Sequence, residues 1–188
     1  MRPRAGPGSA CCTNEVAYIE KQPGSRPASA FSSAARLPSH PTALGRALLA
    51  FSPARTVEMT ILRGLRPYTQ HTVTSPDRFR RALAVTRLSR VAVTRWELEA
   101  GVCGVAMPVF GPGGEVVAAI ELAVGDLKQQ LRPVMAALAI ASRSLSRELT
   151  GDARYGQAVP NRPAQGAEAA PTLSLAPTLS TALAAVGT

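Results

Sequence analysis

Apolar positions recur at regular spacing only in the middle of the chain, and this predicts one folded region with a segment on either side. Residues 1–13 are rich in Pro, Gly and Arg, a composition typical of disorder. Residues 151–188 consist largely of Ala, Pro, Thr, Ser and Gly and include a weakly duplicated tract, 171–176 and 177–182. We expect this stretch to be a disordered tail. The folded domain is therefore predicted at 14–150.

The spacing within 14–150 predicts a mixture of strands and helices. Two helices are each expected to begin at a Ser-Pro pair, in which the serine is the N-cap and the proline is the first helical residue. Gly111-Pro112-Gly113-Gly114 predicts a hairpin between the last two strands. In chain order, the expected elements are a strand at 15–21, a helix at 44–51, helices beginning at Pro53 and Pro76, and strands at 91–95, 102–110 and 115–124.

A long amphipathic helix is predicted after these strands. Leu127, Leu138 and Leu149 belong to a set of apolar positions with a period near 3.6, and Gly151 is the predicted end. Pro133 removes a backbone donor and crowds the preceding turn, so we expect a short turn first and the long helix to begin near Pro133. The order of elements predicts an α+β domain in which helices pack on an antiparallel sheet.

Residues 36–51 form the most informative run of the chain. Pro38 and Pro41 favour an extended backbone, and Leu44, Leu48 and Phe51 then follow at helical spacing. The run is predicted to be a loop that leads into a helix N-terminus, where backbone N–H groups lack partners within the helix. Such a terminus is a possible site for a small ligand.

This run resembles the opening signature of the effector-binding domain of IclR-type transcriptional regulators. Six further pieces of the chain resemble the same domain, in the right order, and together they cover about residues 14–150. The seven pieces are 15–20, 37–50, 65–74, 96–102, 106–110, 114–120 and 141–145. The resemblance implies a GAF-like fold that closes over a small organic acid or aromatic metabolite. It also implies a dimer or tetramer, and an N-terminal winged helix-turn-helix that reads DNA.

Residues 1–13, which precede the predicted domain, are too few for a winged helix-turn-helix. We therefore expect an effector domain without its own DNA reader, either a truncated gene product or a stand-alone one. Operator DNA would then be reached only through a helix-turn-helix domain that is missing here or is carried by a partner.

The family motif, matched by position, implies a set of effector-binding residues in this chain. Members that bind small oxo-acids tend to have an acid, a cysteine and two serines at four of these positions, and this sequence keeps none of the four. Glu121 would repel an anionic ligand unless it is protonated or paired, whereas the small Gly104 and Ala123 are expected to enlarge the space. A polar or amine-bearing metabolite is therefore expected rather than a small oxo-acid. The implied residues are Ala43 and Leu44 (backbone N–H), Thr94, Gly104, Glu121 and Ala123.

Structural roles are the alternatives for several of these polar residues. Glu121 is equally well interpreted as an exposed strand residue paired with an arginine. His40 is expected to satisfy loop backbone groups, Glu97 to cap the turn before Gly101, and Cys103 to be a small buried hydrophobic residue. A domain that only mediates self-association around a vestigial pocket is the alternative function.

Composition excludes several other classes of protein. No apolar run approaches the roughly 20 residues of a membrane span, and the basic N-terminus lacks the apolar core of a secretory signal, which together favour a cytoplasmic protein. Cys11, Cys12 and Cys103 have no metal-ligand or disulfide spacing, so neither a metal nor a cofactor is expected. Ser39, His40 and Glu97 are the most plausible catalytic set. No nucleophile elbow or phosphate-binding loop accompanies them, and an enzyme is not expected.

The formal net charge of +9 raises the question of nucleic-acid binding. A group of arginines lies on or just after the helix predicted from Pro76. Phe79 is the one aromatic residue among them, which argues against a stacking surface. We therefore expect a solvated helix face rather than a nucleic-acid site. The arginines are Arg78, Arg80, Arg81, Arg87 and Arg90.

Overall fold

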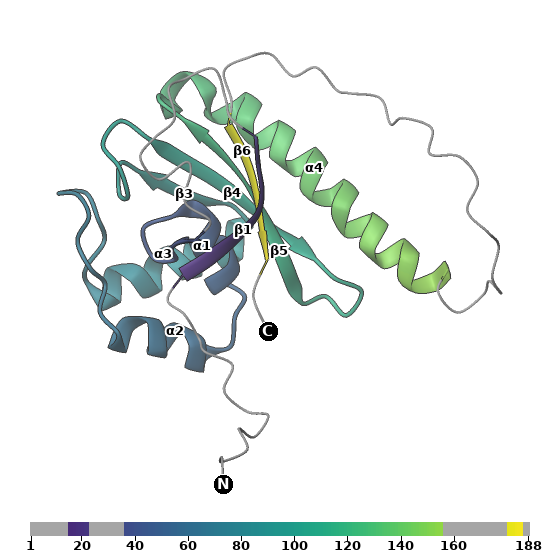
Figure 1. The fold of residues 1–188 in the computed structure, drawn as a ribbon, viewed down its shortest axis with the longest axis horizontal. Coiled ribbons are helices and arrows are strands. Elements are labelled where there is room, and N and C mark those ends of the chain that lie inside the picture. The colour runs from purple at the N-terminus through teal and green to yellow at the C-terminus, as the bar shows by residue number, and fades with distance from the viewer. Residues whose placement is uncertain (1–14, 23–35, 156–179, 186–188) are drawn as a thin grey trace, which may run out of the picture.

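The computed structural model describes residues 15–22, 36–155 and 180–185. They form four helices and six strands (Figure 1). In chain order these are β1 (Glu15–Gln22), β2 (Arg36–Pro38), α1 (Ala43–Leu49), α2 (Ala54–Leu62), α3 (Pro76–Ser89), β3 (Ala92–Arg95), β4 (Cys103–Phe110), β5 (Val116–Val124), α4 (Leu127–Tyr155) and β6 (Ser180–Ala185).

All six strands belong to one antiparallel sheet with the order β2-β1-β6-β5-β4-β3. The hairpin predicted between β4 and β5 is present, and its turn depends on Gly114, whose φ of 81° is accessible to glycine without strain. The ladder shifts register between Val109 and Phe110. The α+β class and the antiparallel sheet are therefore as predicted.

Helices cover both faces of the sheet (Figure 1). The long helix α4 packs against β4 and β5 on one face, where Val105, Ile120 and Leu138 belong to a buried apolar cluster. The short helix α1 packs against β3, β4 and β5 on the other face, where Leu44 and Ala106 belong to a second cluster. A third cluster joins α1 to α2 and α3. The result is a sheet between two helical layers.

Helix α4 differs from its prediction at both ends. It begins at Leu127, continues through Pro133 and reaches Tyr155, rather than beginning near Pro133 and ending at Gly151. Proline removes one intrahelical hydrogen bond and crowds the preceding turn. Here the first turn also places Leu127 in the buried cluster with Val134, and this packing offsets the cost.

The prediction of a disordered tail at 151–188 is wrong for two stretches. Residues 151–155 continue α4, and residues 180–185 form β6 between β1 and β5. An alanine-rich strand shows no alternation of apolar and polar residues, and the two strands that pair with it lie far away in the sequence. No local pattern therefore predicts β6. Residues 1–13 and the rest of the tail lie outside the described residues. The short strand β2, which pairs with β1, was predicted only as an extended loop.

None of the described helices combines the length and the apolar character that crossing a bilayer requires.

Candidate functional site

Five of the six residues implied by the family motif meet where α1 begins above the sheet. Thr94, Gly104 and Ala123 form one row across β3, β4 and β5, because Thr94 is the Cα partner of Gly104 and Gly104 that of Ala123. Glu121 lies two residues from Ala123 on β5, diagonally across from Gly104. Ala43, the first residue of α1, approaches the same point.

The space above Gly104 is occupied. A methyl group built on Gly104 would lie 2.9 Å from Thr94 Oγ1 and 3.0 Å from Ala43 Cβ, and it would overlap Glu121 Oε1. The expectation that Gly104 enlarges an open space is therefore wrong, because the Glu121 side chain lies in the room that the glycine leaves. The site consequently has a carboxylate at its centre.

Glu121 is buried, not exposed as the alternative interpretation required, with 8% of its surface accessible. The Tyr18 hydroxyl of β1 donates a hydrogen bond of 3.3 Å to Glu121 Oε2. The pKa of Tyr18 is raised well above its ordinary value, mainly by burial and to a lesser extent by the Glu121 carboxylate. Tyr18 therefore remains a neutral donor beside the carboxylate throughout the physiological pH range.

Helix α1 is fixed tightly at its start. The Thr42 hydroxyl is the N-cap and accepts a hydrogen bond of 3.2 Å from Gly45 N. Any side chain on Gly45 would overlap the Ser39 carbonyl, so the loop before the helix approaches its first turn as closely as glycine permits. Ala43 and Leu44 are fully buried by this arrangement. Their N–H groups lie in the first turn, where a helix offers no acceptors of its own.

A buried ion pair joins α1 to the loop after β3. The Arg46 guanidinium is paired with Glu97 Oε2, and both residues are buried. Arg46 also donates from Nε to the His40 carbonyl at 3.0 Å and from a terminal nitrogen to the Val93 carbonyl at 3.5 Å. Since Val93 precedes Thr94, this one side chain links the helix that carries Ala43 to the strand that carries Thr94.

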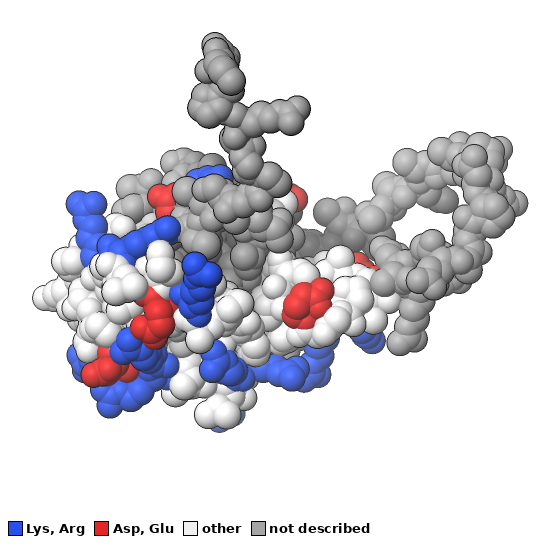
Figure 2. All heavy atoms as spheres, turned by 90° about the horizontal axis from the view of Figure 1, so that it is seen from below, with Lys and Arg blue, Asp and Glu red and all other residues white. Residues whose placement is uncertain are grey.

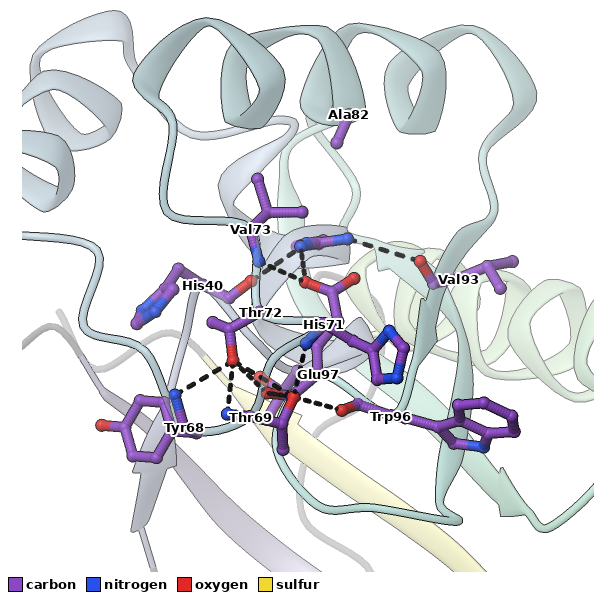
Figure 3. A network of polar contacts seen from close by, with 12 residues as sticks. His40, Tyr68, Thr69, His71, Thr72, Val73, Ala82, Val93, Trp96 and Glu97 are labelled. Atoms are coloured by element: carbon purple, nitrogen blue, oxygen red, sulfur yellow. Dashed lines mark hydrogen bonds and ion pairs between the residues drawn. The ribbon is translucent and has the colours of Figure 1, made fainter.

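The loop between α2 and α3 extends the network around Glu97 (Figure 3). Val73 N donates to Glu97 Oε2 at 3.1 Å. Thr72 donates from its hydroxyl to the Glu97 carbonyl at 2.6 Å, and Thr69 donates to the Trp96 carbonyl at 2.6 Å. Glu97 is thus structural, as expected, but it pairs with Arg46 rather than capping the turn before Gly101.

His40 satisfies a loop carbonyl, as predicted. Its Nε2 lies 2.9 Å from the Arg66 carbonyl, and burial lowers its pKa, so the ring is neutral at pH 7 with the proton on Nε2. Its Nδ1 is buried without a partner among the described residues. Neither nitrogen is hydrogen-bonded to Glu97, so Ser39, His40 and Glu97 lack the base-to-carboxylate contact of a catalytic triad.

Cys103 is buried in the cluster beneath α4, and burial raises the pKa of its thiol, in agreement with the expected structural role. The described residues contain no group of three or more metal-ligating side chains.

The arginines of α3 have several different partners. Arg80 pairs with Glu58 and Asp77, Arg87 donates to the Ala50 carbonyl, and Arg90 lies over the Phe110 ring. Figure 2 shows acidic side chains among the basic ones at one end of the face that it displays. Arg78 and Arg81 line a separate surface hollow of about 790 Å³ with residues 70–75. All five arginines are exposed, and the solvated-face interpretation remains a prediction.

Sequence reasoning missed Tyr18, Arg46 and the whole of β6. Arg46 and Glu97 are 51 positions apart, and Tyr18 and Glu121 are 103 apart, so no local pattern connects them. The usable signal for Arg46 was a charged residue on the apolar face of a short helix, at a position where charges are rarely buried unless they are paired.

Comparison with known proteins assigns the domain. A family model described as the C-terminal domain of the bacterial transcriptional regulator IclR matches residues 9–147. The HTH-type transcriptional regulator XynR of Escherichia coli (strain K12) is 37% identical over 111 residues, which are 57% of this chain and 44% of that protein. The chain spans 40% to 44% of the length of the curated relatives that it matches.

Solved structures agree with this assignment. IclR of Thermotoga maritima superposes with a TM-score of 0.67 at 26% identity, covering 73% of this chain and 57% of that one. The inducer-binding domain of the PobR transcription factor from Acinetobacter, crystallised as a double mutant with 3-hydroxybenzoic acid, superposes with a TM-score of 0.56 at 26% identity. That match covers 60% of this chain and 67% of that one. The GAF-like fold implied by the sequence is confirmed.

Proposed function

Because the chain belongs to the family of IclR C-terminal domains, we propose that it binds a small-molecule effector and so modulates DNA-dependent transcription. The effector site comprises the backbone N–H groups of Ala43 and Leu44, together with Thr94, Gly104, Glu121 and Ala123. The observation that carries the proposal is the convergence of α1 and β3–β5 at these positions, around one buried carboxylate. Support from another protein comes from PobR, whose inducer-binding domain was crystallised with 3-hydroxybenzoic acid.

The Glu121 carboxylate favours a polar or amine-bearing effector over a small oxo-acid. A carboxylate ligand placed beside Glu121 brings two like charges into a buried site, whereas an ammonium group would pair with Glu121. Tyr18 already donates one hydrogen bond to this carboxylate. An ammonium group would therefore be attracted to this carboxylate, whereas a ligand carboxylate would be repelled by it.

In the regulator, the domain self-associates as a dimer or tetramer. Operator DNA is then contacted through a helix-turn-helix domain and not through this domain.

A second candidate function is self-association without sensing. The observation that favours it is that Glu121 and Thr94 lie in the room above Gly104, which leaves little space for a ligand unless Glu121 moves. In that case the pocket is vestigial, and the domain only holds subunits together.

Thermal-shift measurements on the purified chain distinguish the two functions. The probes are pairs that share a skeleton and differ in charge, such as benzylamine with benzoate and ethanolamine with glycolate, together with pyruvate and glyoxylate. A sensor of the proposed kind is expected to melt at a higher temperature with an amine or a neutral polar probe and to be unaffected by the oxo-acids. A chain that no probe stabilises supports the vestigial pocket.

Matched variants locate the response. Glu121→Gln keeps the shape of the side chain and removes its charge, so the preference for amines over carboxylates is expected to disappear. Glu58→Gln makes the same change on the exposed face of α2 and is expected to leave that preference intact. An unchanged amine preference in Glu121→Gln would contradict the assignment of the site.

A further inference from the structure

Strand β6 lies in the middle of the sheet but comes from outside the part of the chain that the family model matches. The match ends at residue 147, whereas β6 is Ser180–Ala185. Its two neighbours, β1 and β5, both lie within the match. In this chain the sheet position between β1 and β5 is therefore filled by a strand from the C-terminal side of the matched residues.

Backbone pairing is the main attachment of β6. It pairs with β1 through residues 181–185 and with β5 through residues 180–185, and no described helix makes comparable contacts with it. The sequence Ser-Thr-Ala-Leu-Ala-Ala has no charge and one large apolar residue, Leu183. A strand whose sequence provides only one large apolar side chain is expected to lie at the low-stability end of a structure and to open locally.

The strands on either side of β6 are anchored without it. Val16 of β1 and Leu37 of β2 belong to the buried cluster that contains Leu44 and Leu48 of α1. Strand β5 is held by β4 and by α4. Removal of β6 would therefore leave two unpaired strand edges facing each other, roughly 10 Å apart at two strand spacings. Such edges bind an extended peptide by main-chain hydrogen bonds.

The connection to β6 is long enough for the strand to leave and return. Strand β6 begins opposite Ala123, near the start of α4, so the chain must return along a 29-residue helix about 43 Å long. Residues 156–179 provide 24 residues, which reach roughly 79 Å when extended. The duplicated tract does not offer a second strand. The segment six residues earlier, 174–179, contains Pro177, which lacks the backbone N–H that a central strand requires.

We propose that the position between β1 and β5 is an acceptor site for an extended, uncharged peptide strand, and that Ser180–Ala185 of this chain binds there reversibly. Binding of the strand is coupled to the site around Glu121. The register places Ala184 opposite Tyr18 and Ala182 opposite Glu121, so the Tyr18–Glu121 hydrogen bond passes over β6 from one neighbouring strand to the other. The strand thus sets the separation of the two residues, and only this coupling rests on the proposed function.

The test uses the full chain with a specific protease site in place of residues 163–169, cleaved after folding. Native mass spectrometry is expected to show the C-terminal fragment retained without a covalent link. A fluorescein-labelled peptide of residues 178–187 is then expected to replace it, measured as a rise in anisotropy. The uncleaved chain should need at least tenfold more peptide, because its tethered strand competes at high effective concentration. The strand can also come from a second copy of the chain. In that case cleavage ends the association that the exchanged strand maintains, while each cleaved chain keeps a bound C-terminal fragment. This outcome supports the same acceptor site.

Two controls make the result specific. The labelled peptide with Ala184→Pro lacks a donor that a central strand requires, so it should bind at least tenfold more weakly. Tyr18→Phe in the cleaved chain should weaken peptide binding at least threefold, whereas Tyr68→Phe, at a residue outside the sheet, should not. Equal binding of both peptides, or a fragment that never exchanges, would overturn the acceptor site. An unchanged affinity in Tyr18→Phe would overturn the coupling.

These measurements contain no metabolite, so they are independent of the thermal-shift probes. A chain that exchanges the peptide but responds to no probe retains the acceptor site and loses the effector function. The reverse result retains the effector function alone.

Discussion

The buried pair of Arg46 and Glu97 provides the most quantitative test of how the site is held. Replacing Arg46 with methionine keeps most of the side-chain volume and removes the charge. Glu97 then retains the hydrogen bond from Val73 N but loses its cation, and the His40 carbonyl loses a donor. Removing one partner of a buried pair typically costs about 3–5 kcal/mol, because the remaining charge stays out of water. We expect Arg46→Met to lower the free energy of unfolding by about 4 kcal/mol.

Urea unfolding measures this change, with the single tryptophan, Trp96, as the fluorescent probe and far-UV circular dichroism as the second signal. The double variant Arg46→Met/Glu97→Met removes both charges and should recover at least about 1 kcal/mol relative to Arg46→Met alone. Arg80→Met is the matched control, because Arg80 pairs with Glu58 in an exposed position where water and salt screen the interaction. If Arg46→Met and Arg80→Met destabilise the chain equally, the reasoning about the buried pair is refuted.

Three further variants test other features of the structure. Gly104→Ala places a methyl group against Glu121 and Ala43, so the free energy of unfolding should fall by about 1–3 kcal/mol. Urea titrations measure this change, and an unchanged free energy of unfolding would show that the space above Gly104 is open. Tyr18→Phe tests the raised pKa of Tyr18. Above the ordinary tyrosine pKa of about 10 the unfolded chain loses that proton while the native chain keeps it, so wild-type stability falls as the pH rises and the variant should show a shallower fall between pH 10 and 11.5. Identical slopes would contradict the burial of this hydroxyl. Pro133→Ala restores a donor within α4 and should raise the free energy of unfolding by about 1 kcal/mol, whereas Pro76→Ala at the first turn of α3 should not raise it; equal effects would mean that Pro133 costs the helix nothing.

Elements whose pairing or capping is local could be predicted from the sequence. The Gly111–Gly114 turn has its two strands on either side, and Ser75-Pro76 marks the start of α3 without reference to the rest of the chain. The positions of Thr94, Gly104 and Glu121 also followed from a local match to the family motif. Their meeting in space depends on strand register that the alternation of β4 and β5 largely determines.

Features decided by distant contacts could not be predicted. Gly104 was expected to leave space, and the length of the Glu121 side chain, lying diagonally across the ladder, fills it. Pro133 was expected to delay α4, and burial of Leu127 outweighs its local cost. Strand β6 has no alternation and only one large residue, Leu183, so its pairing depends on edges contributed by β1 and β5.

The position of β6 has a consequence for synthesis of the chain. Strand β1 is the first described element to be made, and one of its two sheet partners follows roughly 160 residues later. At about 5–20 residues per second, a ribosome needs on the order of 8–30 s to cover that distance. Throughout this interval one edge of β1 has no partner from its own chain. The growing polypeptide therefore presents an open strand edge to its neighbours, and polysomes that bring nascent copies close together are where mispairing of this domain is most probable.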